Sequence, residues 1–163
     1  MKKITVITVA TRNNIFLDDD YKIGELTYPD WFSLKAKITI NDGSSYYLEP
    51  KGMFSSGIEV KGDGEVLFTT LGSWKGYIMI SDVINKRDYT LKMQGFFSNG
   101  YVVTDSNNKE LFRIAQIFSW KQFRTSYEIE LIDFDLFHKQ DELLLFIAFY
   151  SYKTFMTAMA NGY

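Results

Sequence analysis

Four basic residues around one predicted hairpin suggest the chemistry that this sequence supports best. Lys86 and Arg87 lie in the turn segment 85–88, and Lys75 and Lys92 lie on the neighbouring predicted strands. Ammonium and guanidinium groups bind phosphate through charge-assisted hydrogen bonds, so these residues are candidates for binding an anionic lipid headgroup. Ordinary surface charge is the competing interpretation, because Lys and Arg are mostly exposed in any protein.

Acidic residues are the other candidates for chemistry. Glu128 and Glu130 share one face of a predicted strand, and Asp133 and Asp135 follow it. Paired carboxylates cleave glycosides when they face each other across a cleft, but neighbouring acids on one strand more often form a solvated face. His138 is the only histidine, and the sequence has neither a GxSxG elbow nor HExxH spacing. We therefore predict no catalytic residue, metal or cofactor, and keep a carboxylate-dependent enzyme acting in a barrel mouth as an alternative.

Composition narrows the class of protein. The chain has 163 residues and no linker-like segment, which predicts one domain over residues 1–163. The net charge of −2 lacks the basic excess of a nucleic-acid binder. The absence of cysteine excludes disulfide-linked partners and thiolate metal sites, and it fits the reducing cytoplasm. The Lys-, Asn- and Ile-rich composition fits a bacterial origin.

Short runs of Ile, Val, Tyr, Phe and Thr alternate with turn residues, which predicts an antiparallel β fold. The predicted hairpins at 57–68 and 100–113 are similar in sequence, and a looser copy covers 15–26. Trp31, Trp74 and Trp120 each follow one of these hairpins, at spacings of 43 and 46 residues. Three copies are too few for a propeller, so we predict repeated meander units that close into one barrel.

Residues 143–160 break the strand pattern, because they are apolar on almost every side and contain no turn residue. A helix of this kind is either buried in protein or crosses a membrane. Lys153 lies inside the segment, no basic cluster flanks it, and the strands need an apolar partner, so we predict a core helix. A tail-anchored membrane protein is the alternative.

The hairpins at 60–68 and 102–112, followed by the apolar segment 143–160, resemble the tubby C-terminal-like superfamily. The nearest resemblance is to the group of LURP-one-related proteins and phospholipid scramblases. The resemblance implies a mainly β fold, a closed barrel of roughly twelve antiparallel strands that encloses a hydrophobic C-terminal helix. It also implies a non-enzymatic binding or scaffold module in the cytoplasm or at the membrane periphery, with an anionic phospholipid or a protein as partner. The scramblases' cysteine-rich and proline-rich segments are missing, and the resemblance assigns no site residue.

Overall fold

The computed structural model describes residues 2–10, 12–30, 34–51, 57–73, 75–94, 100–119, 124–132 and 142–160. These ranges contain twelve strands and one helix, α1 (Glu142–Ala160). The strands are β1 (Lys2–Val9), β2 (Asn13–Asp18), β3 (Tyr21–Thr27), β4 (Ala36–Ile40), β5 (Ser45–Pro50), β6 (Gly57–Gly62), β7 (Glu65–Gly72), β8 (Tyr77–Asp82), β9 (Arg87–Met93), β10 (Gly100–Asp105), β11 (Glu110–Ser119) and β12 (Arg124–Leu131).

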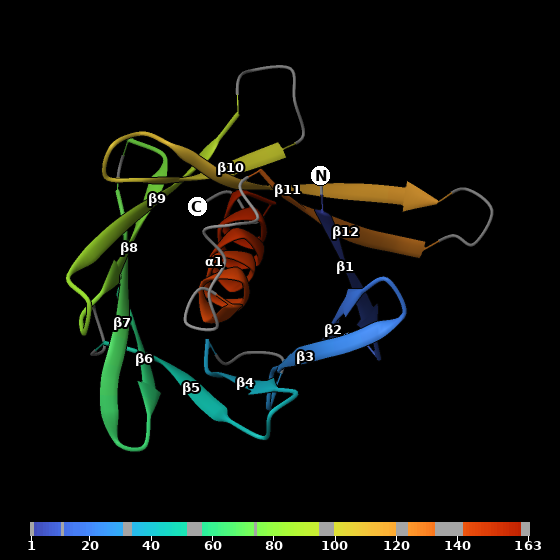
Figure 1. Ribbon diagram of the computed structural model, residues 1–163, viewed down its shortest axis with the longest axis horizontal. Coiled ribbons are helices and arrows are strands. Elements are labelled where there is room, and N and C mark those ends of the chain that lie inside the picture. The colour runs from blue at the N-terminus through green and yellow to red at the C-terminus, as the bar shows by residue number, and fades with distance from the viewer. Residues whose placement is uncertain are drawn as a thin grey trace.

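The strands form one closed antiparallel barrel (Figure 1). Each strand pairs with the next strand in the sequence, and β1 closes the barrel by pairing with β12, where Ile4 lies opposite Ile129. Antiparallel neighbours can be joined by short turns, and closure leaves no unpaired edge strand. The predicted twelve-stranded barrel is confirmed.

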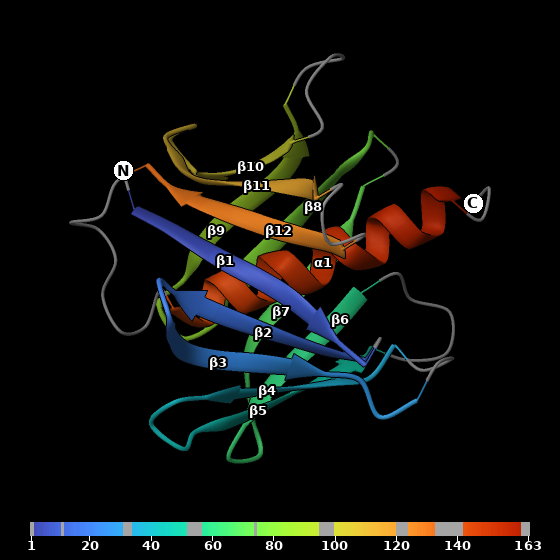
Figure 2. The same cartoon turned by 90° about the vertical axis from the view of Figure 1, so that its right-hand side faces the viewer.

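Helix α1 fills the lumen of this barrel. Every side chain over residues 143–152 is buried, and this run covers all faces of a helix with 3.6 residues per turn. Figure 2 shows strands crossing over the helix and its last turns projecting beyond them. A barrel of about eight strands is filled by its own side chains, so a twelve-stranded wall needs something as wide as a helix inside. The predicted core helix is confirmed.

The tail-anchor alternative requires helix α1 to cross a membrane, whereas the strands of the barrel surround that helix. Within the described residues, no helix has both the length and the hydropathy needed to cross a membrane.

Three hairpins of the barrel share the same irregularity. A β-bulge shifts the register of β2–β3, β6–β7 and β10–β11, and it precedes the hairpin turn each time. The three turns also share a residue with positive φ: Asp19, Asp63 and Asn108. Because the feature recurs at every fourth strand, the weak sequence repeat corresponds to a structural repeat. The three tryptophans of the repeat lie outside the described residues.

Beside each bulge, two residues that lie opposite each other on the hairpin strands face the lumen. The first copy has the larger residue on its first strand, whereas the other two copies have it on their second strand. In the second and third copies a valine faces a phenylalanine, whereas in the first a phenylalanine faces a glycine. The pairs are Phe16 with Gly24, Val60 with Phe68, and Val103 with Phe112.

Gly24 makes room for the helix at this point. The ring of Phe146 on α1 lies with its centroid 4.1 Å from that of Phe16, and it occupies the space above Gly24. A Cβ atom on Gly24 would lie 2.6 Å from the Phe146 ring and 2.7 Å from the carbonyl oxygen of Thr39. Close contact between wall and helix therefore requires a glycine here.

We expect Gly24→Ala to lower the free energy of unfolding by about 1–3 kcal/mol, the usual cost of overpacking a core. The backbone oxygen of Thr39 is part of the obstacle, so rotation of Phe146 alone cannot relieve the clash. Urea titration of both proteins measures the difference. Gly72→Ala is the matched control in β7, because its Cβ would meet nothing within 4 Å. Equal stability of the two variants would contradict the packing argument.

Candidate functional site

The two ends of the barrel differ in chemistry. We call them the helix-entry end, where α1 begins, and the helix-exit end, where its last turns leave the barrel (Figure 2). Because the strands alternate in direction, the connections β2–β3, β4–β5, β6–β7, β8–β9 and β10–β11 lie at the helix-entry end. The connections β1–β2, β3–β4, β5–β6, β7–β8, β9–β10 and β11–β12 lie at the helix-exit end.

The helix-exit end is basic. The charged residues in its described connections are Arg12, Lys35, Lys51 and Lys75, opposed by Asp30 alone. At the adjoining strand ends, Lys37 and Lys92 outnumber Glu49, and Lys153 adds a further positive charge from α1. The helix-exit end therefore has an excess of positive charge, although the whole chain has a net charge of −2.

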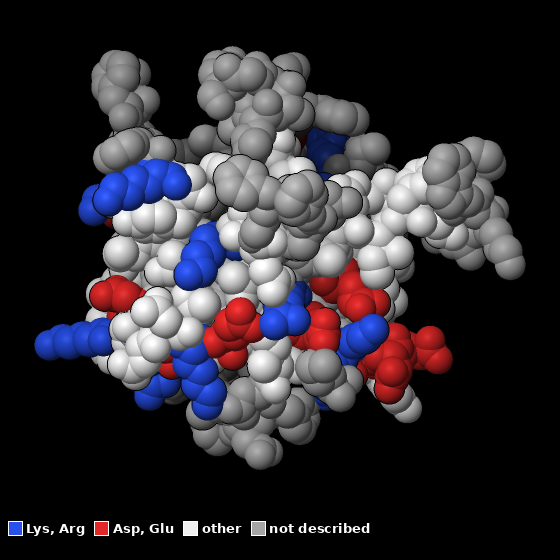
Figure 3. All heavy atoms as spheres, turned by 90° about the horizontal axis from the view of Figure 1, so that it is seen from above, with Lys and Arg blue, Asp and Glu red and all other residues white. Residues whose placement is uncertain are grey.

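The helix-entry end is acidic. Its described connections and the start of α1 carry Asp19, Asp20, Asp42, Asp63 and Glu142, opposed by Lys86 and Lys109. Figure 3 shows the barrel wall from above, with most of the red acidic side chains in the lower half, toward the helix-entry end, and with blue basic side chains in both halves. Charge is therefore separated along the barrel axis.

Exposed apolar side chains also gather at the helix-exit end. Their described members are Val9, Leu34, Leu71, Met93, Ile117, Phe118 and Met156. Fewer large apolar side chains are exposed at the helix-entry end, where the described ones are Tyr21, Val83 and Ile84. The helix-exit end thus combines positive charge with apolar surface.

Tyrosine rings surround α1 where it leaves the barrel. The Tyr101 and Tyr127 ring centroids lie 5.0 and 5.9 Å from that of Tyr152. The hydroxyl of Tyr150 donates a hydrogen bond to the Leu34 carbonyl at 2.5 Å, which ties the helix to the β3–β4 connection. Burial raises the pKa of Tyr150 and of Tyr152 to about 12, so both phenols are neutral at pH 7.

Lys153 lines a cavity of about 270 Å³ in this ring of tyrosines; the other lining residues are Gln116, Tyr127, Tyr152, Met156 and Thr157. Its Nζ atom lies 5.2 Å from the centroid of the Tyr127 ring, which gives a cation–π contact. Burial lowers the pKa of Lys153. No carboxylate of the described residues forms an ion pair with it. Among the described residues, the half-buried positive charge of Lys153 therefore has no counter-ion.

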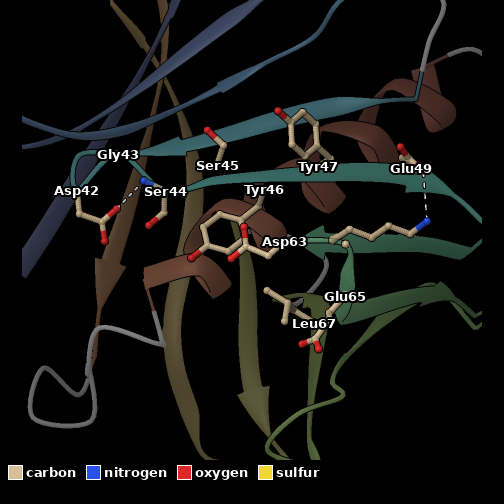
Figure 4. A pocket seen from close by; sticks show the side chains of 13 residues that line it. Asp42, Gly43, Ser44, Ser45, Tyr46, Tyr47, Glu49, Asp63, Glu65 and Leu67 are labelled. Atoms are coloured by element: carbon tan, nitrogen blue, oxygen red, sulfur yellow. Dashed lines mark hydrogen bonds and ion pairs between the residues drawn. The ribbon is translucent and has the colours of Figure 1, made fainter.

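An acidic groove of about 910 Å³ lies at the tips of the β4–β5 and β6–β7 hairpins (Figure 4). Asp42, Glu49, Asp63 and Glu65 line it together with Lys61. The Asp42 carboxylate accepts a hydrogen bond from the backbone N–H of Ser44 at 2.8 Å, and Glu49 pairs with Lys61 at 3.6 Å. Asp63 and Glu65 project into solvent.

This groove is where the enzyme alternative can be compared with the structure. A general acid needs a carboxyl group whose pKa is raised, which requires burial or a close second acid. The groove carboxylates are exposed or half-exposed, so they lack the burial that this chemistry requires. No three His, Cys, Asp or Glu side chains in the described ranges gather closely enough to hold a metal ion.

The structure divides the four basic residues that the sequence suggested. Lys92 lies opposite Tyr77, beside the β7–β8 connection that carries Lys75, so these two share the helix-exit end. Arg87 lies opposite Asp82 and follows Lys86 in the β8–β9 turn, so these two share the helix-entry end. The length of β8, about 17 Å at 3.3 Å per residue, separates the pairs. The four residues therefore do not form one cluster.

The two acidic candidates of β12 that the structure describes do not converge on a cleft. Glu128 and Glu130 lie on the outer face of β12, and Glu128 forms an ion pair with Lys3 at 3.0 Å. This is the solvated face that adjacent acids on a strand favour. Asp133, Asp135 and His138 lie outside the described residues.

We expect Lys153→Met to raise the melting temperature at pH 7, because the folded state disfavours the ammonium form of Lys153. Below the lowered pKa, Lys153 is charged in both the folded and unfolded states and the full penalty acts. Above its ordinary pKa of 10.5 it is neutral in both states and the penalty disappears. The difference in melting temperature should therefore narrow as the pH rises from about 7 to about 10.5.

Scanning calorimetry of the wild type and variant across this pH range measures the effect. Lys92→Met, at an exposed position of the same end, is the control and should show no such narrowing. A constant difference for Lys153→Met would mean that packing, and not charge burial, determines its effect.

Comparison of the chain with protein-family models, with curated proteins and with solved structures finds no match in any of the three. The candidate site is therefore defined by its geometry and charge alone.

Proposed function

We propose that this chain is a non-enzymatic binding module that attaches to anionic membranes through the helix-exit end of its barrel. The observation that carries the proposal is the separation of charge between the two ends. Positive charge and exposed apolar side chains share one end, while acidic side chains dominate the other.

This combination suits the surface of an anionic bilayer. Each Lys or Arg near such a surface contributes about 1 kcal/mol, and the attraction falls off within a Debye length of about 10 Å. Side chains such as Leu34 and Phe118 add apolar area that can enter the headgroup region. In this orientation the helix-entry end faces away from the membrane, so its acids do not oppose binding.

The same architecture supports a relationship with the tubby-like superfamily, within the LURP-one-related and scramblase-like group. That relationship rests on the closed barrel and its enclosed C-terminal helix. A place at the cytoplasmic face of a membrane follows from the proposed binding mode. A protein partner remains the other ligand class, and vesicle binding separates the two because it needs no second protein.

A matched pair of double variants tests the role of the helix-exit end. Lys75→Ser with Lys92→Ser, and Lys86→Ser with Arg87→Ser, each remove two positive charges, but from opposite ends of the barrel. At about 1 kcal/mol per charge, the first variant should bind anionic vesicles about thirtyfold more weakly. The second should lose much less affinity, because its charges lie about 17 Å, more than one Debye length, farther from the membrane. Co-sedimentation with vesicles of phosphatidylglycerol and phosphatidylcholine at about 0.1 M salt, where the Debye length is about 10 Å, measures both affinities.

Two results would contradict the proposal. The first is wild-type binding to anionic vesicles no stronger than to pure phosphatidylcholine. The second is an equal loss of affinity in both double variants, since this would show that total charge and not the helix-exit end determines binding.

A further inference from the structure

We propose that the cavity beside Lys153 binds a phosphate monoester group. The inference rests on the proposed function only for the source of that group, which on a membrane is the headgroup of an anionic lipid. The cavity itself is defined by residues of β11, β12 and α1.

Each polar side chain that lines the cavity is able to donate a hydrogen bond. Lys153 offers an ammonium group, and Gln116 offers a side-chain amide. The hydroxyls of Tyr127 and Tyr152 form no hydrogen bond with another described residue, and burial raises the pKa of both, so each keeps its proton for donation. The Thr157 hydroxyl is already used, because it donates to the Lys153 carbonyl at 2.9 Å.

No carboxylate among the described lining residues competes for these donors. None of the six described residues that line the cavity is acidic, so no internal carboxylate neutralises Lys153. An anion placed there would offset the cost of keeping the ammonium half-buried, and it would accept hydrogen bonds from the free phenols. A phosphate monoester has three terminal oxygens, which can meet several donors at once.

The size and position of the cavity limit what can enter. Its volume of about 270 Å³ lies just below the range of about 300–1,000 Å³ typical of small-molecule pockets. It suits a phosphate group and the first carbons attached to it, and not a whole lipid. Met156, which lines the cavity, is 38% exposed, so acyl chains can remain outside against an apolar side chain.

The first experiment uses glycerol 3-phosphate, a soluble phosphate monoester, with the full chain. We expect saturable binding, measured by calorimetric titration and by the shift of the Lys153 ammonium signal in NMR spectra. Lys153→Met should weaken binding at least tenfold, and Lys153→Arg should retain most of it. Lys86→Met, an exposed lysine at the helix-entry end, should bind like the wild type. The melting temperature of each variant shows that loss of binding is not loss of folding.

The second experiment separates lipid from soluble ligand. Vesicles that contain phosphatidic acid display a phosphate monoester, and vesicles of phosphatidylglycerol with matched surface charge display only phosphodiesters. The wild type should prefer phosphatidic acid several-fold, and Lys153→Met should lose that preference. The Lys75→Ser, Lys92→Ser variant should weaken binding to both vesicles equally, because it changes only the general attraction.

The outcomes distinguish the cavity from the membrane function. Lys153-dependent binding of glycerol 3-phosphate without vesicle binding supports the cavity and rejects the membrane proposal. Charge-dependent vesicle binding with neither glycerol 3-phosphate binding nor a preference for phosphatidic acid overturns the cavity and leaves the membrane proposal standing. Binding of glycerol 3-phosphate that is unchanged in Lys153→Met also overturns the cavity.

Discussion

The structure depends on filling the lumen of a twelve-stranded barrel. A wall of this circumference encloses more space than inward-facing side chains can occupy, and an empty lumen would forfeit the packing that makes a core stable. Helix α1 supplies the missing volume, with an unbroken run of buried residues from 143 to 152. Because that run leaves no polar face, the helix is equally dependent on the wall. Barrel and helix therefore stabilise each other, and neither is expected to be stable alone.

An enclosed helix also makes the two ends of the barrel different. The first turn of the helix, with Glu142, lies at one end, and its last turns, with Lys153 and Met156, lie at the other. Acidic side chains dominate the entry end and basic side chains the exit end, so a chain with a net charge of −2 still presents a strongly basic surface. The net charge of the chain therefore does not predict what it binds, because a membrane or a ligand contacts only one end of the barrel and its local charge.

Much of the fold could be predicted from the sequence, because hydrophobic patterning and turn residues act locally. The strands, the terminal helix and the repeat at 57–68 and 100–113 are examples. The basic end could not be predicted, because Arg12, Lys35, Lys51 and Lys75 are far apart in sequence. They lie at the same end only once the barrel closes. The prediction of one basic cluster around the hairpin of Lys86 and Lys92 was wrong for a related reason. Residues that are close in sequence lie at opposite ends of the barrel when an extended strand runs between them.

The repeat explains why the candidate sites differ from one sector of the wall to the next. The bulged hairpins recur at every fourth strand, but one helix presents a different set of side chains to each copy. The second and third copies both keep a valine opposite a phenylalanine, whereas the first copy does not. The first copy therefore has Gly24 where the others have Phe68 and Phe112, because Phe146 takes the space. Lys153 faces Gln116 of β11, in the third copy, and Tyr127 of the neighbouring strand β12. Function in such a barrel is expected where the wall departs from its own repeat.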